Sequence, residues 1–366
     1  MYSRVVVKVG SSTLTNPSGG LDHDYIAQLV EQLCTLRAEG VSPVLVSSGA
    51  IAAGLESLGL EIRPDDMPSL QAAASVGQVR LVEAYAHHFA RHDVPVGQVL
   101  LTRHDTGHRE SYLHARDTFE RLFALGAVPI VNENDTVAVE EIRIGDNDTL
   151  AALVATMVSA DLVVLLSDIQ GLYDADPRVV EEASLLENVT ELTADLVAAA
   201  GGSGSALGSG GMLTKLEAAK VLMKAGIPMV ICDGREPGVV IDAAEGRPVG
   251  TLFAGGESTI SARKLWIALG RRPAGEIVID DGAVKALVER GKSLLAAGVV
   301  SVSGKFVAGD AVVLKSQAGN VVARGLSEFS AADLDRIKGM RSSAIEAAHP
   351  HIVSTEVVHR DRLVIF

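Results

Sequence analysis

Four short polar clusters carry the residue types that a phosphate-binding site needs. The first is the segment Lys8-Val9-Gly10-Ser11-Ser12, which follows a short apolar run. The ammonium group of Lys8 can reach a phosphate, and Gly10 lets a ligand approach the backbone closely. Taken alone, this cluster is weak evidence for a phosphate site, because a lysine at a solvated strand end would have the same neighbours in the sequence.

The second cluster is the segment Ser47-Ser48-Gly49-Ala50-Ile51-Ala52-Ala53-Gly54. Hydroxyl groups and free backbone N–H groups at the start of a helix can bind an anion. The same pattern is typical of an N-cap followed by a helix of small residues that packs closely on a neighbour. Taken alone, the residues favour neither interpretation.

The third cluster consists of Asn132-Glu133-Asn134-Asp135 and Gly145-Asp146-Asn147-Asp148, which together span 17 residues. Asn and Asp are common in turns, so turns alone are the alternative. However, the second segment opens a predicted helix whose first turn holds Asp148. A carboxylate there can cap the helix, hold Mg²⁺ or accept hydrogen bonds from ammonium groups. Two such segments close together favour a functional site.

The fourth cluster, Gly208-Ser209-Gly210-Gly211-Met212-Leu213-Thr214-Lys215, opens another predicted helix. A glycine loop with hydroxyl groups and a lysine at a helix N-terminus can cradle phosphates. The spacing is neither that of a Walker A loop nor G-x-G-x-x-G. A flexible linker is the alternative, especially for the glycines at 201–204, but Lys215 at the helix start favours the phosphate loop.

Alternating strands and helices must position these clusters. Apolar runs predict strands at 5–9, 43–46, 94–101, 128–131, 162–166 and 227–231, and helical spacing predicts helices at 22–39, 69–91, 111–125, 148–160 and 213–225. This alternation predicts an α/β fold with a doubly wound, mainly parallel sheet. Ligands in such sheets bind beyond the carboxyl ends of the strands, where the polar clusters fall.

The pattern changes near residue 255. Glycine-containing segments at 255–258 and 271–275 flank a short helical stretch, and short strands are predicted at 276–280, 298–303, 310–314 and 321–325. We therefore expect a main domain at 1–256, a linker at 257–274 and a small β-rich domain with a tail at 275–366.

The 366 residues carry a formal net charge of −14, which repels nucleic acid and anionic substrates overall. Any phosphate must therefore be bound by local lysines, glycine loops and a metal ion. Cys34 and Cys232 are far apart and outside any C-x-x-C pair, which predicts reduced core thiols rather than a metal site. No apolar run approaches the roughly 20 residues that span a bilayer, and the first nine residues read as a strand rather than a signal peptide. We expect a cytoplasmic protein.

Taken together, the clusters resemble the amino-acid kinase superfamily and, within it, the glutamate 5-kinases, over essentially the whole chain. The resemblance rests on Lys8-Val9-Gly10-Ser11, Ser48-Gly49-Ala50-Ile51-Ala52-Ala53-Gly54, Gln98-Val99-Leu100-Leu101-Thr102, Asn132-Glu133-Asn134-Asp135, Gly145-Asp146-Asn147-Asp148, Ser167-Asp168, Gly171-Leu172-Tyr173, Asp176-Pro177 and Gly210-Gly211-Met212. The segments Gly275–Ile277, Leu294-Leu295 and Gly298 resemble a PUA domain. Ser209 stands where the family usually has Thr, and the hydroxyl is retained.

The resemblance implies an amino-acid kinase fold with a PUA-like domain, and ATP-dependent phosphorylation of the γ-carboxylate of L-glutamate, the first step towards proline. Carried over to this sequence, it implies a role in catalysis for Lys8, Lys215, Asp148 and Asp146. It implies glutamate binding by Ser48, Asp135 and Asn147. It implies ATP binding by Lys8, Ser167, Asp168, Ser209, Gly210, Gly211, Met212, Leu213, Thr214 and Lys215.

The resemblance also implies Mg²⁺ bound with ATP, held by phosphates and water rather than by protein ligands. It implies a homo-oligomer, a dimer or a tetramer, and feedback inhibition by proline. Asp105, Glu140 and Glu141 lie near the implied glutamate loop and are candidates for tuning that inhibition.

PUA domains in RNA-modifying enzymes bind RNA, but residues 274–352 hold nine Lys and Arg against nine Asp and Glu. RNA binding normally needs a basic surface, so a structural or regulatory role is favoured. Two other functions stay open. One is a kinase for another acceptor of the superfamily, namely N-acetylglutamate, aspartate, carbamate or UMP. The other is an RNA-binding regulator with a relict kinase fold, which the intact Lys8, Asp148 and Lys215 disfavour.

Overall fold

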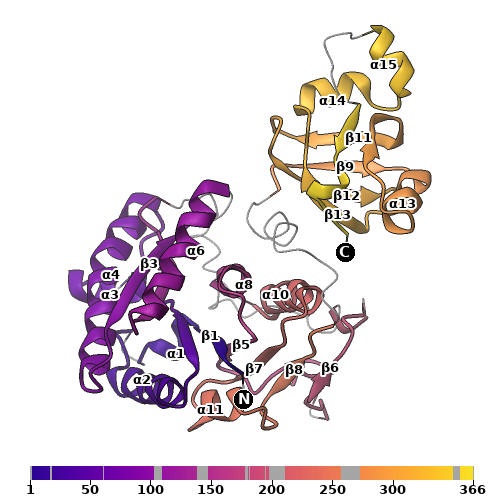
Figure 1. Ribbon diagram of the computed structural model, residues 1–366. Coiled ribbons are helices and arrows are strands. Elements are labelled where there is room, and N and C mark those ends of the chain that lie inside the picture. The colour runs from indigo at the N-terminus through magenta and orange to yellow at the C-terminus, as the bar shows by residue number, and fades with distance from the viewer. Residues whose placement is uncertain are drawn as a thin grey trace. The chain divides into compact units, whose positions relative to one another are not determined.

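The computed structural model of the chain describes residues 2–16, 19–60, 62–102, 109–137, 147–177, 180, 182–193, 195–197, 211–256, 273–348 and 355–365. The chain divides into two compact units, Met1–Thr259 and Ile260–Phe366 (Figure 1). Each has a hydrophobic core of its own. Residues 257–272 lie outside the described ranges, so the linker at 257–274 stays a prediction.

The first unit is built on an eight-stranded sheet in the order β3-β4-β2-β1-β5-β7-β8-β6. Its strands are β1 (Arg4–Val9), β2 (Ser42–Val46), β3 (Val96–Leu101), β4 (Val128–Glu133), β5 (Leu162–Ser167), β6 (Asn188–Val189), β7 (Met229–Asp233) and β8 (Thr251–Phe253). Six strands that are neighbours in space, β3, β4, β2, β1, β5 and β7, pair in parallel. Strand β8 runs antiparallel to β7. The predicted α/β fold with a mainly parallel sheet is confirmed.

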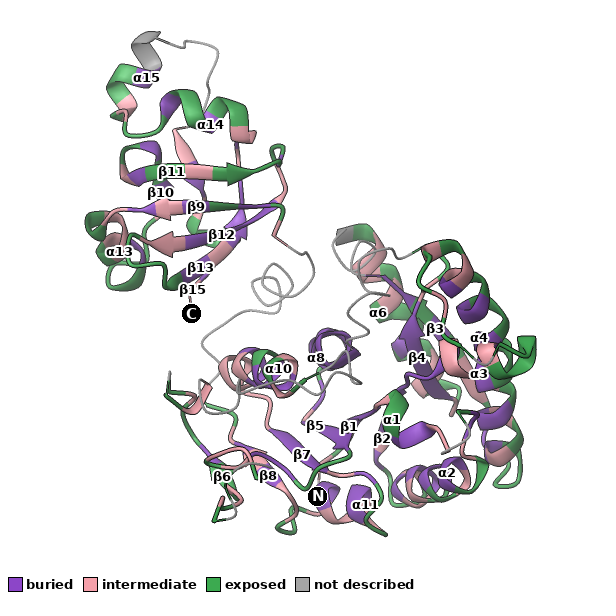
Figure 2. Cartoon of the chain, turned by 180° about the vertical axis from the view of Figure 1, so that it is seen from behind, coloured by how far each residue is buried: buried purple, intermediate pink, exposed green. Residues whose placement is uncertain are grey.

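Helices pack around this sheet (Figures 1 and 2). They are α1 (Ser11–Leu14), α2 (His23–Ala38), α3 (Ala50–Leu58), α4 (Met67–Ala90), α6 (Arg109–Ala124), α8 (Asn147–Met157), α10 (Met212–Ala225) and α11 (Val239–Ala244). Strands buried on both faces are typical of parallel sheets, which explains why β1, β4 and β5 are buried along almost their whole length. No helix in the described ranges is long and apolar enough to cross a membrane.

Alternation along β1 decides which face each side chain meets. Val5, Val7 and Val9 belong to one core with residues of α2 and α11. Lys8 lies between them in sequence, so its side chain points to the opposite face, which α8 covers. A single lysine in an apolar strand is thereby placed against the start of a buried helix.

Two glycines bring α3 unusually close to α4. A Cβ atom on Gly54 would lie 1.7 Å from the carbonyl oxygen of Ala73, and one on Gly77 would lie 1.7 Å from that of Ala50. No side chain fits at either position, so the backbones of the two helices touch. The small residues after Ser48 therefore serve helix packing, one of the two interpretations that the sequence left open.

The second unit contains a five-stranded sheet in the order β11-β9-β12-β13-β15 and a two-stranded sheet of β10 and β14. Its strands are β9 (Gly275–Ile279), β10 (Leu294–Leu295), β11 (Val299–Gly304), β12 (Ala311–Ser316), β13 (Val321–Leu326), β14 (Glu356–Val358) and β15 (Leu363–Ile365). Its helices are α13 (Asp281–Val288), α14 (Ala331–Ile337) and α15 (Ser342–Ala348), with 3₁₀ turns at Ala296–Gly298 and Arg360–Arg362. The expected small β-rich domain is present.

Candidate active site

Polar residues from three neighbouring strands, β1, β2 and β5, meet at the carboxyl end of the first sheet. Lys8 is the residue before the end of β1, and it pairs in register with Val46 of β2 and Leu165 of β5. Because these strands are parallel, their carboxyl ends lie together. The same edge therefore carries Ser48, just beyond β2, and Ser167, the last residue of β5.

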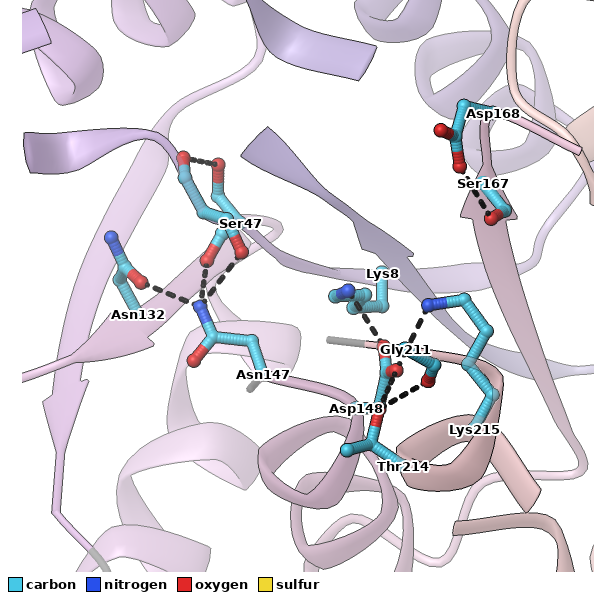
Figure 3. A network of polar contacts seen from close by, with 11 residues as sticks. Lys8, Ser47, Asn132, Asn147, Asp148, Ser167, Asp168, Gly211, Thr214 and Lys215 are labelled. Carbon is cyan, nitrogen blue, oxygen red and sulfur yellow. Dashed lines mark hydrogen bonds and ion pairs between the residues drawn. The ribbon is translucent and has the colours of Figure 1, made fainter. Parts of the chain in front are cut away.

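Asp148 lies at the centre of the site and is completely buried (Figure 3). Its Oδ1 atom is 2.6 Å from Nζ of Lys8 on β1. Its Oδ2 atom is 3.1 Å from Nζ of Lys215 on α10, and both lysine side chains are less than 10% exposed. Three residues separated by up to 207 positions thus form one ion triad, with a single carboxylate bridging two ammonium groups.

The charges of this triad determine the ionisation of Asp148. Burial alone raises the pKa of a carboxyl group, but the adjacent Lys8 and Lys215 outweigh it and lower the pKa of Asp148 to about 2. The carboxylate is therefore ionised near neutral pH. Two positive charges against one negative charge leave the triad with a net charge of +1, which attracts a phosphate anion.

The start of α10 adds a hydroxyl group to this triad. Thr214 Oγ1 lies 3.1 Å from Asp148 Oδ2 and 2.8 Å from the carbonyl oxygen of Gly211. Gly211 is the N-cap of α10 and is exposed, and as a glycine it has no side chain with which to cap the helix. The free N–H groups of a helix N-terminus are suited to bind phosphate oxygens.

Asn147, the neighbour of Asp148 on α8, organises the other half of the site. Its Nδ2 atom lies 2.7 Å from the carbonyl oxygen of Ser47, 3.0 Å from Oγ of Ser48 and 3.0 Å from Oδ1 of Asn132. This amide connects the ends of β2 and β4 (Figure 3). The first turn of α8 therefore supplies Asp148 to the ion triad and Asn147 to the polar group of Ser47, Ser48 and Asn132.

Asn132 also belongs to the site, although in the sequence it stands out only as a member of the Asn132–Asp135 cluster. Its Oδ1 atom accepts hydrogen bonds from the side chain of Asn147 and from the backbone N–H of Glu133. Its Nδ2 atom is buried and, within the described part of the chain, has no hydrogen-bond partner. A buried amide donor beside Ser48 and Asn147 is available to a ligand. The only signal in the sequence was an asparagine directly after an apolar strand.

Gly10 leaves space beside the first lysine. A Cβ atom there would lie 3.7 Å from Nζ of Lys8 and 3.9 Å from Oγ of Ser12, which are ordinary contacts. Its φ of −83° is open to any residue. Glycine is therefore not required by the fold at this position, and the space that a methyl group would fill lies next to the ammonium group.

Ser167 and Asp168 lie at the end of β5, where Ser167 Oγ is 3.2 Å from Asp168 Oδ1. The chain that follows them is anchored by Thr251 of β8, whose Oγ1 accepts a hydrogen bond of 2.8 Å from the backbone N–H of Leu172. A Cβ atom on Gly171 would lie 2.4 Å from the same oxygen. Close packing on Thr251 therefore explains the glycine.

Other expected site residues are not part of these contacts. Asp135 lies two residues beyond the end of β4 and is half-buried, while Met212 is half-buried and Leu213 is exposed. Asp146, Ser209 and Gly210 lie outside the described residues, as do Asp105, Glu140 and Glu141.

Two further expectations bear on metals and thiols. Within the described ranges no group of three or more His, Cys, Asp or Glu side chains is arranged to hold a metal ion. Cys34 and Cys232 are both buried free thiols, as expected.

Comparisons with known proteins identify the family of this chain. Residues 3–233 match the amino acid kinase family and residues 275–349 match the PUA domain. A glutamate 5-kinase of Geobacter sulfurreducens is 46% identical over 362 residues, which cover 99% of this chain and 97% of that protein. One of Paraburkholderia xenovorans is 47% identical over the same shares, and one of Meiothermus ruber is 47% identical over 98% and 95%. The chain belongs to the amino acid kinase family and, within it, to the glutamate 5-kinases.

Proposed function

We propose that this protein transfers the γ-phosphoryl group of ATP to the γ-carboxylate of L-glutamate, giving L-glutamyl 5-phosphate and ADP, as the first step of proline biosynthesis. The observation that carries the proposal is the buried Asp148, which bridges the ammonium groups of Lys8 and Lys215. The names of the relatives, which match over nearly their whole length, supply the acceptor.

The reaction needs positioning and charge stabilisation more than acid–base chemistry. The γ-carboxylate is already ionised at neutral pH, so one of its oxygens attacks the γ-phosphorus without a general base. A new P–O bond forms as the bond to the ADP oxygen breaks, and the electron pair leaves with ADP. Negative charge is spread over the phosphoryl oxygens during this transfer.

Lys8 and Lys215 are placed to neutralise that charge. Each ammonium group has three N–H donors, and the contact with Asp148 engages one side of each. The positive charge of both ammonium groups suits the phosphoryl oxygens. Because the two lysines come from different elements, one on β1 and one on α10, they can approach the phosphoryl group from two directions.

We assign glutamate to the side of the site organised by Asn147. Ser48 Oγ and Nδ2 of Asn132, which has no partner among the described residues, are donors that suit a carboxylate, and Asn147 holds both side chains in place. Asp135 lies on the same strand end and suits the α-ammonium group of glutamate by charge. This arrangement puts the acceptor on the β2–β4 side and ATP on the β5–α10 side.

ATP is assigned to the start of α10 and to the end of β5. The residues from Gly211 to Leu213 offer backbone N–H groups to the phosphates, and Lys215 offers an ammonium group. Ser209 and Gly210 extend the same loop in the sequence. Ser167 and Asp168 lie at the end of strand β5. The loop that follows them is held by the hydrogen bond from the backbone N–H of Leu172 to Oγ1 of Thr251.

Mg²⁺ fits this site as a companion of ATP. The central Asp148 is engaged by two lysines and a threonine, and the described residues provide no cluster of carboxylates as a cage. Mg²⁺ tolerates this, because it keeps much of its water and binds chiefly to substrate phosphates. When bound, the ion would neutralise phosphate charge and orient the phosphates.

The decisive experiment is a hydroxamate assay. Purified protein is incubated with MgATP, hydroxylamine and one of glutamate, N-acetylglutamate or aspartate, since an acyl phosphate reacts with hydroxylamine. We expect hydroxamate with glutamate alone and its loss in Lys215→Ala. If hydroxamate formed with N-acetylglutamate or aspartate instead, the assignment of glutamate as the acceptor would be wrong. No product from any acceptor with the folded protein would refute the kinase assignment.

We further propose that the protein works as a homo-oligomer and is inhibited by proline, as the family resemblance implies. Exposed apolar side chains support an interface between copies: Val76 and Val79 on α4, and Leu100 on β3, which is an edge strand. Light scattering tests the oligomer, and a glutamate titration with and without proline tests inhibition. The two buried reduced cysteines suit the cytoplasm as the compartment.

For the PUA unit we propose a structural or regulatory role rather than RNA binding. Three of its basic side chains are engaged by acids: Lys315 by Glu276, Lys338 by Asp335 and Arg362 by Glu328. Such pairing reduces the positive field that RNA binding requires. A filter-binding titration with structured RNA at two salt concentrations should show no saturable binding, and tight salt-dependent binding would overturn the proposal.

A further inference from the structure

Thr214 makes a contact that its place in a nucleotide loop does not explain. It is the third residue of α10, and its Oγ1 lies 3.1 Å from Asp148 Oδ2 and 2.8 Å from the carbonyl oxygen of Gly211. A threonine hydroxyl has one proton to donate. The carbonyl oxygen is the nearer acceptor, but the ionised carboxylate gains more from the proton, because a charge-assisted hydrogen bond is roughly twice as strong as a neutral one.

The contact bears on the orientation of the carboxylate. Asp148 Oδ2 is shared by Thr214 and Lys215, which are neighbours on one helical turn, whereas Oδ1 faces Lys8. The terminal torsion of an aspartate is soft, so the plane of its carboxylate depends on the donors around its two oxygens. A second, neutral donor on Oδ2 resists that rotation without adding positive charge. The plane of Asp148 in turn determines where both ammonium groups lie.

We propose that Thr214 is a positioning residue for phosphoryl transfer, which acts by holding the Asp148 carboxylate so that Lys8 and Lys215 stay aimed at the transferring group. This inference rests on the proposed kinase function. It differs from a direct contact between Thr214 and ATP, because a positioning role affects the rate of transfer and leaves nucleotide affinity unchanged.

The test uses a pair of substitutions that separate the hydroxyl from the shape of the side chain. Thr214→Val removes the hydroxyl at nearly constant volume, and Thr214→Ser keeps it. We expect Thr214→Val to lower kcat at least tenfold with unchanged KM for glutamate and unchanged affinity for a non-hydrolysable ATP analogue. Thr214→Ser should restore kcat to within about threefold, in line with a retained charge-assisted hydrogen bond.

Thr35→Val is the matched control. Thr35 is also half-buried on a helix and donates its hydroxyl to the carbonyl oxygen of Glu31 at 2.9 Å, but it lies on α2 and has no contact with Asp148. Its kcat should equal that of the unsubstituted protein. A loss of kcat in Thr35→Val as large as in Thr214→Val would overturn the proposal, because the effect would then belong to any helical threonine.

A double-mutant cycle with Asp148→Asn tests whether Thr214 acts through the carboxylate. The free energy of unfolding in urea is measured for both single variants and the double variant, so the cycle does not depend on turnover. We expect Thr214→Val to cost stability in the unsubstituted protein and much less in the protein that already carries Asp148→Asn. Equal costs in both proteins would show that the two side chains are independent and would refute the proposal.

The remaining outcomes are distinct from one another. If the unsubstituted protein forms no hydroxamate with glutamate, the proposed function fails before any variant is measured. If it is active and Thr214→Val keeps its kcat, the positioning role alone fails. A weaker affinity for the ATP analogue with unchanged kcat would make Thr214 a nucleotide contact instead. Equal losses of kcat in the Thr214→Val and Thr214→Ser variants would point to packing rather than the hydroxyl.

Discussion

At the scale of single residues, the site depends on a buried charge that is stabilised only by its neighbours. Asp148 has no access to water, so ionising it without Lys8 and Lys215 would be costly. With both lysines in place, the carboxylate is the more stable form. The same arrangement keeps two ammonium groups close together in the interior, because Asp148 screens their mutual repulsion.

The pH dependence of stability follows from this triad. The pKa of Asp148 is lowered to about 2 in the folded chain and is about 3.9 in an unfolded one. A lowered pKa contributes stability that is complete above about pH 4 and is lost as the pH falls towards 2, on the order of 2 kcal/mol in all. Asp148→Asn removes this contribution. The difference in unfolding free energy between the two proteins should therefore shrink from pH 6 to pH 3, and a constant difference would contradict the assignment.

Gly10 offers a second prediction at this scale. Gly10→Ala places a methyl group 3.7 Å from Nζ of Lys8, in a backbone conformation that alanine accepts. We expect an unchanged melting temperature and a loss of kcat/KM of about 100-fold, the cost typical of misplacing a reacting group by about 1 Å.

Gly256→Ala is the control for Gly10→Ala, since its Cβ would also make only an ordinary contact, 3.5 Å from the carbonyl oxygen of Met223. It should keep full activity. If Gly10→Ala also kept full activity, the space beside Lys8 would not be where the phosphoryl group binds.

At the scale of elements, α8 connects the two halves of the site. Its first two residues, Asn147 and Asp148, contact the ends of β2 and β4 on one side and β1 and α10 on the other. Every residue of α8 is buried, so the helix has little freedom to shift. The distance between the proposed acceptor side and the proposed ATP side is thus determined by one rigid helix rather than by two separate loops.

The contact between α3 and α4 gives a prediction at this scale. Gly54→Ala would place its Cβ atom 1.7 Å from the carbonyl oxygen of Ala73, so the helices must separate. Overpacking of this kind costs about 1–3 kcal/mol or more. Because α3 begins directly after Ser48 and Gly49, we also expect the KM for glutamate to rise while the affinity for ATP is kept. Thermal unfolding and steady-state kinetics measure both effects, and unchanged values would show that the helices can adjust.

At the scale of the whole molecule, the two units have separate cores. The first core lies around β1 and β5 with α2 and α11, and the second around β9, β12 and β13. All the residues assigned to ATP and glutamate belong to the first unit.

Calorimetry in the presence of ligands tests this division. A non-hydrolysable ATP analogue alone, at about 100 times its dissociation constant, should add about 2.7 kcal/mol to the stability of the first unit. That corresponds to an upward shift of its transition by roughly 5–10 °C. The transition of the PUA unit should not move. A single transition that shifts as a whole would show that the units unfold together.

Much of the first unit could be predicted from the sequence, because a parallel sheet buried on both faces leaves continuous apolar strands between amphipathic helices. The strand at 5–9 and the helix at 22–39 were expected almost at their observed bounds, Arg4–Val9 and His23–Ala38. Short elements were missed. The three-residue strands β8 and β15 are too brief to show a period, and they form only because a neighbouring strand supplies hydrogen bonds.

The sequence by itself determined the residue types of the site and their positions at strand ends and helix starts. Lysine, aspartate and glycine at those positions already pointed to phosphate chemistry. Only the tertiary structure supplied the contacts themselves: Asp148 lies against both Lys8 and Lys215, and the side-chain oxygen of Asn132 accepts from Asn147 while its amide nitrogen has no partner within the described part of the chain. Local patterns report on a residue and its near neighbours along the chain. Contacts between residues far apart in the sequence, such as Asp148 and Lys215, depend on the order and register of the strands, which arise from packing the whole sheet.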